Sequence, residues 1–399
     1  MQIGFSCEFD ISIDSSSIQA IMKAFSKLLP LLLKDFMQKI LLGFAEFYMS
    51  QERKPFECPC GNAEHFIWKT RHGKQTGVLT LFMMVWLDQL QVQCKACGRK
   101  QYITRKLLEL EPRQRIARDI RRKLGLIGAL TSFRVSEKIA SLFGCALDKM
   151  TVWRAVQQTA QEVELGLDPK GLAHGEADGT GIPIQGIKKR GKELKVFVQL
   201  KRTGGIRVAG LSIGDYDKGW DKLFFPLLEG LKSFRSFLLV TDGDTCILKG
   251  LGSTVKVLLQ RCLWHIPHQL KYCLWRDKVK RKSEVWRKVL VGILDICALP
   301  KLVEQELIND VVRHKKECLG QLILFCTQNG FAHSAVYLEN ARLHMFTAID
   351  NRLKGKTTSH VERVMRTVNM RINVGKWSQA GALNVNKIRL AYYYNGFDA

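Results

Sequence analysis

The sequence predicts a mixed α/β protein in which a small cysteine-bracketed unit and an all-helical region precede a larger α/β domain. From about residue 171, short apolar runs alternate with amphipathic segments, in the order three strands, helix, strand, helix, strand. Upstream, two pairs of cysteines enclose a β-rich stretch, and apolar residues then recur at helical spacing. We therefore expect an N-terminal helical segment (1–56), the cysteine-bracketed unit (57–104), a helical region (105–170) and the α/β domain (171–399).

The composition is that of a globular protein, and the net charge favours binding to a polyanion. Of its 399 residues, 46% are hydrophobic and 25% charged, which is typical of folded domains and excludes a disordered or collagen-like chain. With 62 Lys and Arg against 37 Asp and Glu, the formal net charge is +25, and this favours nucleic acid as a partner. No apolar run is long enough to span a membrane, and residues 1–16 lack a signal-peptide pattern. We expect no membrane contact and a cytoplasmic, nucleoid-associated protein.

The N-terminal segment has the periodicity of a helix. Apolar residues recur at helical spacing over 18–50, and Pro30 is expected to kink or divide this helix because proline removes a hydrogen-bond donor. The preferred interpretation is a pair of packing helices, and an oligomerisation element is the alternative.

Two cysteine pairs have the spacing of a structural zinc site. The strings Cys58-Pro-Cys60-Gly and Cys94-Lys-Ala-Cys97-Gly each end in a glycine, which supplies the positive φ that a metal-binding turn requires. Four thiolates would bind one Zn²⁺ and stabilise a segment too short to form its own core. Because the first pair is Cys-x-Cys, a site in which His65 replaces one thiolate and a set of four unligated cysteines remain alternatives. We expect this zinc-ribbon-like unit to be structural, since protein fills all four ligand positions.

The helical region contains a candidate helix-turn-helix. The segment 136–144 has Ala140 where two helices would approach closely and Gly144 at the turn, and Thr151 and Arg154 follow on the polar face of the next helix. The turn is about two residues longer than usual for this motif. Residues 99–123 hold ten Lys and Arg and three Asp and Glu, a local net charge of +7. We expect this region to contact DNA, mainly at phosphates, and a solvated basic helix is the alternative.

The α/β domain is predicted element by element from its apolar pattern. The expected strands are 176–180, 195–200, 206–213, 237–241 and 255–259, and the expected helices are 219–233, 247–251, a helical block over about 270–345 and a last helix that begins near Thr358.

Three acidic residues lie on separate elements of this domain. Asp178 follows a strand-like segment, Asp242 ends the most apolar strand, and Glu362 lies in a basic amphipathic helix. Taken singly, such residues are usually turn formers, caps or ion-pair partners. Together they fit three carboxylates that jointly hold two Mg²⁺ ions. Asp244 competes with Asp242 for this role, and Glu176 competes with Asp178.

Four strings carry a resemblance to a known family: Asp178-Gly-Thr, Asp242-Gly, Gln260-Arg-Cys262-Leu-Trp-His265, and Thr358-Ser-His-Val-Glu362-Arg with Arg366 and Arg371 after it. With them, residues 175–385 resemble the catalytic domain of DDE transposases with the ribonuclease H-like fold, and more narrowly the Mutator-like group and its bacterial and archaeal insertion-sequence relatives. The Cys-x-x-His string is the most specific of the four. That family has a helical insertion before its last acid, which corresponds to the block over 270–345.

The resemblance implies a polynucleotidyl transferase built on a ribonuclease H-like mixed sheet. Asp178, Asp242 and Glu362 would be catalytic and hold two Mg²⁺ or Mn²⁺ ions, and Cys262 and His265 would flank the active site without an assigned chemical step. The implied reaction is cleavage at transposon ends followed by strand transfer to target DNA. An inactive or domesticated DNA-binding derivative, and a nuclease without strand transfer, are the alternatives.

The implied partners are transposon-end and target DNA, bound by a homodimer or higher oligomer. Besides 99–123, positive charge concentrates at 271–288, with eight Lys and Arg and two acids, and at 352–376, with seven Lys and Arg around Glu362. The residues expected to contact DNA are Arg113, Arg115, Arg121, Arg122, Thr151, Arg154, Arg363 and Arg366.

Overall fold

The chain forms two compact units, residues 1–159 and residues 160–398. The structure is a computed structural model, and it describes residues 6, 8–69, 74–80, 83–110, 115–142, 147–168, 171–187, 192–202, 204–234, 236–253, 255–299 and 305–398.

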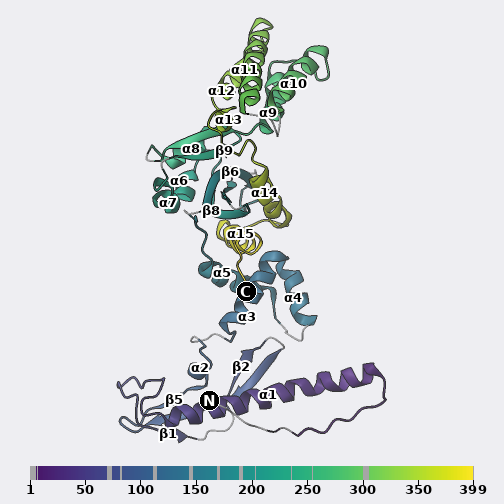
Figure 1. Cartoon of the computed structure of the whole chain (residues 1–399). Helices are drawn as coiled ribbons and strands as arrows, with labels where there is room; N and C mark the ends of the chain where they lie inside the picture. Colours follow the sequence, from purple (N-terminus) through teal and green to yellow (C-terminus); the bar gives the residue numbers. More distant parts are fainter. Residues whose placement is uncertain are drawn as a thin grey trace. The chain divides into compact units, whose positions relative to one another are not determined.

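The N-terminal unit contains one long helix and two small antiparallel sheets (Figure 1). Helix α1 (Ile18–Ser50) is continuous through Pro30, so this proline does not divide it and the expected helix pair is a single helix. One sheet has the order β1-β4-β5, and the other is the hairpin of β2 and β3. These strands are β1 (Phe66–Lys69), β2 (Gln75–Leu79), β3 (Met84–Asp88), β4 (Gln91–Cys94) and β5 (Lys100–Tyr102).

Helices follow these sheets, as the apolar periodicity predicts. They are α2 (Thr104–Leu107), α3 (Arg118–Leu130), α4 (Phe133–Leu142) and α5 (Lys149–Glu162). Helices α3 and α5 pack closely at Gly128, where a Cβ atom would lie 2.7 Å from the side chains of Val152 and Val156. Helices α4 and α5 occupy the two halves of the candidate helix-turn-helix, and Gly144 of the expected turn lies outside the described residues.

A five-stranded mixed sheet forms the centre of the C-terminal unit, with the strand order β10-β9-β6-β7-β8. Strands β6 (Leu172–Ile182), β7 (Lys192–Lys201) and β8 (Ile206–Gly214) are antiparallel neighbours. Strands β9 (Phe237–Thr241) and β10 (Val257–Arg261) run parallel to β6. The predicted mixed α/β architecture is thus confirmed. Several bounds differ from the expected ones. Strand β6 runs from Leu172 to Ile182 and still pairs with β7 beyond Asp178, β7 begins at Lys192, and β10 begins and ends two residues later than expected.

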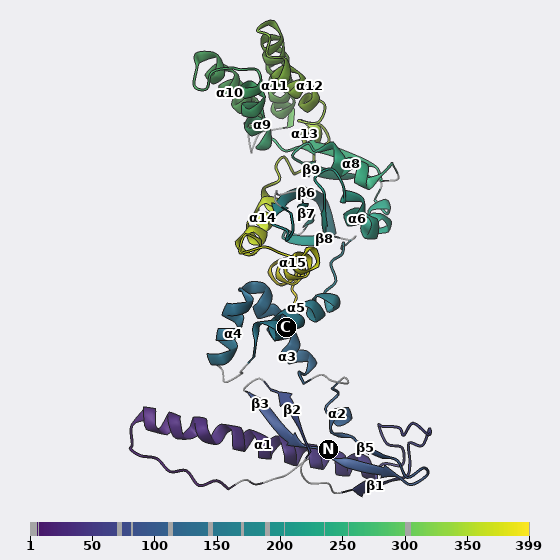
Figure 2. The same ribbon diagram turned by 180° about the vertical axis from the view of Figure 1, so that it is seen from behind.

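Helices cover both faces of this sheet, as Figures 1 and 2 show from opposite sides. One face packs against α6 (Trp220–Phe224), η2 (Phe225–Leu227), α7 (Leu228–Lys232) and α8 (Thr245–Leu251). These short pieces replace the single helix expected over 219–233, since Pro226 interrupts it. The other face carries α14 (Ser359–Ile372), with α15 (Gln379–Tyr394) beside it. Ala177 belongs to the core beneath α6 and α8, so strand alternation directs Glu176 and Asp178 toward α14.

The helical block expected over 270–345 is present. Helices α9 (His265–Arg276), α10 (Glu284–Cys297), α11 (Gln305–Gln328) and α12 (Ala332–Arg342) gather on one side of the unit around an apolar core of their own (Figure 1). The short helix α13 (Thr347–Asp350) leads back to the sheet. There, the buried Gln260 side chain donates to the carbonyl of Met345 at 2.7 Å and accepts from the N–H of Ala348 at 2.8 Å.

Candidate active site and metal centres

Two of the three predicted acids lie near the same end of two neighbouring strands in the middle of the sheet. Strands β6 and β9 are parallel, with Glu176 opposite Val240, so Asp178 on β6 and Asp242 directly after β9 are each two residues further along. Asp178 is half-buried. This burial, the charge of Asp242 and the charge of Glu362 raise the pKa of Asp178 to about 7. The carboxylates of Asp242 and Glu362 are therefore each near enough to Asp178 to repel its charge.

A tight turn after β9 gives two neighbouring acids different roles. Asp242 Oδ1 accepts the N–H of Asp244 at 2.9 Å, and Gly243 between them has a φ of +105°. A Cβ atom on Gly243 would lie 2.4 Å from Nε of Arg261. Asp244 is the N-cap of α8, because its Oδ1 accepts the N–H of Cys246 at 2.9 Å. Asp244 thus caps a helix, and Asp242 is the acid whose charge contributes most to the pKa of Asp178.

Glu362 lies at the end of a chain of polar contacts that starts at the Cys-x-x-His string. His265 Nε2 is 3.0 Å from Glu362 Oε1, and His265 Nδ1 is 3.3 Å from the Thr358 hydroxyl. Thr358 donates to Cys262 Sγ from both its hydroxyl and its backbone N–H, each at 3.3 Å. Burial by itself would lower the pKa of His265, but hydrogen bonds with Cys262 and Glu362 raise it to about 10. His265 is therefore a cation bonded to the third acid.

Glu176 connects the strand of Asp178 to the helix of Glu362. Its side chain is fully buried, and its Oε2 accepts the N–H groups of His360 at 3.0 Å and Val361 at 2.8 Å in the first turn of α14. Burial opposes its charge, but the nearby imidazole of His174 and the hydrogen bonds from His360 and Val361 hold the pKa of Glu176 below its usual range. Glu176 therefore has a contact of its own at the start of α14, and the choice between Glu176 and Asp178 as the first acid stays a prediction.

A hollow of about 250 Å³ lies beside Glu362. Its wall includes the indole of Trp264, which is 56% exposed, together with Ser359 and Arg366 from α14. Arg366 is one of the residues predicted to contact DNA. The third acid therefore borders a space with one aromatic and one basic wall.

The donor set of the three acids suits a hard divalent cation. Carboxylate oxygens are the ligands that Mg²⁺ and Mn²⁺ prefer. Burial and the charges of Asp242 and Glu362 raise the pKa of Asp178, and a cation beside it would stabilise its ionised form. Two groups of His, Cys, Asp or Glu in the described parts of the chain have ligand atoms that all lie within 4.8 Å of one another. These are the cysteine quartet and His174 with Glu176 and His360, and the three acids do not form a third such group.

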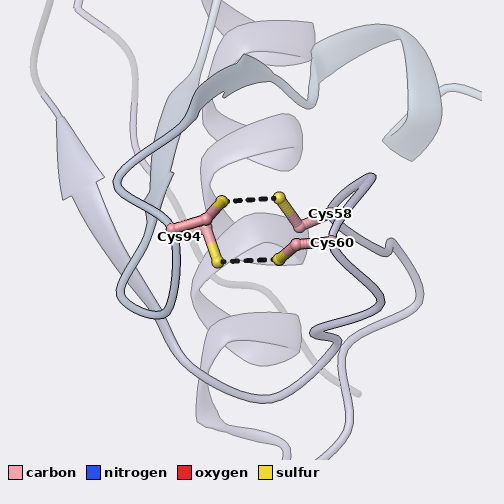
Figure 3. Close-up of side chains that lie close together, drawn as sticks. Cys58, Cys60 and Cys94 are labelled. Carbon is pink, nitrogen blue, oxygen red and sulfur yellow. Dashed lines mark hydrogen bonds between the residues drawn. The ribbon is translucent and has the colours of Figure 1, made fainter.

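The predicted cysteine quartet converges as a cluster that can hold a metal ion such as Zn²⁺. Cys58 Sγ is 3.4 Å from Cys97 Sγ, and Cys60 Sγ is 3.8 Å from Cys94 Sγ. Figure 3 shows the thiols of Cys60 and Cys94 facing one another. His65 is not part of the cluster, so the four-thiolate version of the prediction fits the geometry.

The turns around these cysteines favour a thiolate at Cys94, whereas burial and the neighbouring thiols raise the pKa of Cys58 to about 12. Gly61 and Gly98 have φ values of +85° and +71°, the left-handed conformation that the glycine positions predicted. Asn62 Nδ2 donates to Cys94 Sγ at 3.1 Å, and this bond is the largest contribution that lowers the pKa of Cys94 to about 6. The cluster therefore contains a sulfur that is readily deprotonated, as metal binding requires.

The residues predicted to contact DNA separate into groups. Arg115, Arg121, Thr151 and Arg154 line one hollow of about 360 Å³ in the N-terminal unit. Asp148 in the same wall caps α5 by accepting the N–H of Thr151 at 2.8 Å. The other predicted residues lie elsewhere: Arg122 is on α3 outside this wall, Arg363 and Arg366 are on α14, and Arg113 lies outside the described residues.

Sequence reasoning missed Thr358, His174 and His360 as members of these clusters. Thr358 connects Cys262 to His265 across 96 and 93 residues of sequence, a distance over which spacing carries no information. His174 shares a strand face with Glu176 because the two are two residues apart, and this alternation is the signal that would have paired them.

The chain matches no protein-family profile, and a search of curated proteins finds no match. Across the described ranges, no helix is both long enough and apolar enough to cross a membrane.

Proposed function

We propose that the chain is a DDE-type transposase that binds transposon-end DNA and catalyses metal-dependent strand cleavage and strand transfer. The observation that carries the proposal is that two acids from distant elements act on the charge of Asp178. The charges of Asp242 and Glu362 both raise the pKa of Asp178, and His265 bonds Glu362. All five residues of the predicted site, including Cys262, thus belong to one connected cluster.

The architecture of the C-terminal unit supports the same proposal. Three antiparallel strands followed by two parallel ones, with helices on both faces, are compatible with the ribonuclease H-like fold that the resemblance implies. Helices α9 to α12 lie in sequence between the second and third acids, where that family has its helical insertion.

The proposed roles follow from the geometry of the cluster. Asp178, Asp242 and Glu362 would hold two Mg²⁺ or Mn²⁺ ions, which when bound activate the attacking hydroxyl and stabilise the leaving oxygen. His265 bonds one oxygen of Glu362 and so limits the orientations of that carboxylate. The Gly179 N–H donates to Asp178 Oδ1 at 2.8 Å and restricts the first acid in the same way. The exposed Trp264 and Arg366 give the approaching DNA strand an apolar and a basic surface.

The N-terminal unit would bind the DNA ends. Its cysteine cluster would hold one structural Zn²⁺, and α4 and α5 would act as a helix-turn-helix. The hollow lined by Arg115, Arg121 and Arg154 is suited to a phosphate group, because guanidinium groups bind phosphate with several donors. We also propose that the chain acts on DNA as a dimer or higher oligomer in the cytoplasm.

The decisive experiment uses DNA ends taken from the sequence that flanks the gene. The full chain is incubated with these ends, a target duplex and Mg²⁺, and both nicked and joined products are measured. Asp178→Ala, Asp242→Ala and Glu362→Ala should each abolish both products while DNA binding persists. Asp350→Ala is the matched control, since this exposed acid pairs with Lys316 at 2.9 Å.

Three results would replace the proposal. Joined products that survive all three substitutions would contradict the catalytic assignment. Nicks without joined products would indicate the nuclease alternative, and DNA binding without either product would indicate an inactive derivative.

A further inference from the structure

A second constellation of metal-ligating side chains lies between β6 and α14, apart from the three acids. Glu176 Oε1 is 2.8 Å from His360 Nδ1 and 3.5 Å from His174 Nε2. The ligand atoms of the three residues all lie within 4.8 Å of one another. The separations of 2.8 and 3.5 Å are those expected for ligands of one transition-metal ion, since each metal-to-ligand bond is about 2.0–2.2 Å long.

The environment of the His174 side chain indicates a bound ligand. This residue is 94% buried, being 6% exposed, and its Nε2 is a buried atom with no hydrogen-bond partner. Its ring is confined by Gly355, where a Cβ atom would lie 3.0 Å from the same nitrogen. A buried imidazole nitrogen that faces a carboxylate without a hydrogen bond is costly unless another group satisfies it.

The two carboxylate oxygens of Glu176 have different contacts. Oε2 receives the N–H groups of His360 and Val361, which fixes the carboxylate in place. Oε1 faces the two imidazoles. A fully buried carboxylate needs a compensating positive charge, and a divalent cation at Oε1 would supply it. The backbone donors at Oε2 would then orient this ligand, as hydrogen bonds to the second oxygen commonly do in metal sites.

We propose that His174, Glu176 and His360 bind a divalent transition-metal ion that clamps the start of α14 onto β6. Two imidazoles and one carboxylate suit Zn²⁺, Fe²⁺ or Co²⁺, whereas Mg²⁺ prefers oxygen ligands alone. His360 is partly exposed, with 38% of its side chain accessible, so an ion has a path from solvent and room for a water ligand. The ion is structural, because it fixes the helix that carries Glu362.

This inference does not depend on the transposase proposal. The ligands are His174, Glu176 and His360, and the proposed Mg²⁺ site uses Asp178, Asp242 and Glu362. The two sites share β6 and α14 but no side chain, so each can fail without the other.

The test measures Co²⁺ binding by visible absorption in the full chain with Cys94→Ser and Cys97→Ser, which removes the thiolate cluster. With Mg²⁺ in excess to fill the site of the three acids, we expect one Co²⁺ per chain, with weak d–d bands and no sulfur-to-cobalt charge-transfer band. Addition of His360→Ala or Glu176→Gln should weaken Co²⁺ binding by about tenfold to a hundredfold or more. Replacement of residues that only hydrogen-bond to metal ligands already lowers metal affinity by about that factor. Glu176→Gln keeps an acceptor for the backbone of α14, and circular dichroism verifies the fold.

Controls separate this site from its neighbours. His344→Ala removes another partly exposed histidine of the same unit and should leave Co²⁺ binding unchanged. Excess Mg²⁺ should not displace the Co²⁺. The proposal is overturned if the cysteine-substituted chain binds no Co²⁺, or if binding is lost with Asp178→Ala and retained with His360→Ala.

Discussion

His265 Nε2 lies 3.0 Å from Glu362 Oε1, and this contact joins the first residue of α9 to the first turn of α14. The pKa of His265 is raised to about 10 by Cys262 and Glu362 in spite of its burial. The histidine is therefore protonated at neutral pH, and its charge accompanies the carboxylate. We therefore predict that His265 positions the Glu362 carboxylate.

Replacement of His265 by glutamine should therefore lower the rate of strand cleavage more than the affinity for DNA. Glutamine can still donate one hydrogen bond but carries no charge, so Glu362 loses its ionic partner. The measurement compares the initial rate of cleavage at saturating DNA with the DNA dissociation constant. His268→Gln is the matched control, because His268 lies one turn later on α9, and its ring centroid is 4.3 Å from that of Trp264 with the two rings tilted by 40°. Equal rates in the two variants would contradict a positioning role.

The turn after β9 predicts opposite behaviour for two aspartates. Asp242→Asn should abolish cleavage, whereas Asp244→Asn should retain it, because asparagine caps helices as well as aspartate does. Asp244→Ala should lower the free energy of unfolding by about 0.5–2 kcal/mol through loss of the α8 cap. Cleavage assays and denaturant unfolding measure the two effects. If Asp244→Asn abolished cleavage in a folded protein, the second acid would be misassigned.

The glycine within this turn provides a test of packing. Gly243→Ala adds a Cβ atom 2.4 Å from Arg261 Nε at a φ of +105°. Gly186→Ala has a similar backbone conformation, with φ at +78°, but nothing lies within 4 Å of the added atom. The difference between the two variants isolates the clash, and we expect Gly243→Ala to be less stable by about a further 1–3 kcal/mol. Thermal unfolding measures this difference, and equal stabilities would show that Arg261 moves freely.

The cysteine cluster predicts one tightly bound Zn²⁺ per chain. Cys94→Ser with Cys97→Ser should remove this ion and lower the unfolding temperature of the N-terminal unit, since metal binding contributes directly to folding in such units. Cys318→Ser, outside the cluster on α11, serves as the control. Metal analysis by mass spectrometry provides the measurement. A wild-type chain free of zinc after purification without chelators would contradict the assignment.

The hollow of the N-terminal unit predicts a phosphate contact. Arg154→Gln should weaken DNA binding to a similar degree for different sequences and reduce the slope of log K against log salt by about 1. Arg313→Gln is a control, because Arg313 already pairs with Asp310 at 2.6 Å on the exposed surface of α11. Binding isotherms at several salt concentrations give both slopes. An unchanged slope for Arg154→Gln would place the DNA elsewhere.

Local patterns predicted most elements of the C-terminal unit. The apolar run over 237–241 coincides with β9, and the start near Thr358 coincides with α14, which has Thr358 as its N-cap residue. These elements are bounded by turn and cap residues, whose effect is local. Helix α15 was not predicted as a separate element. The break at Pro226 was missed as well, because the amphipathic pattern continues across it.

The candidate residues were evident in the sequence alone: the four cysteines, the three acids and the Cys-x-x-His string. Their residue types and spacing are properties of the chain. Tertiary structure decided which neighbours share each site. It assigns Asp244 to the cap of α8 and Glu176 to the cap of α14, and it brings His174 to His360 across 186 residues. Such pairings depend on strand register and helix packing, which bring together residues whose separation in sequence carries no signal.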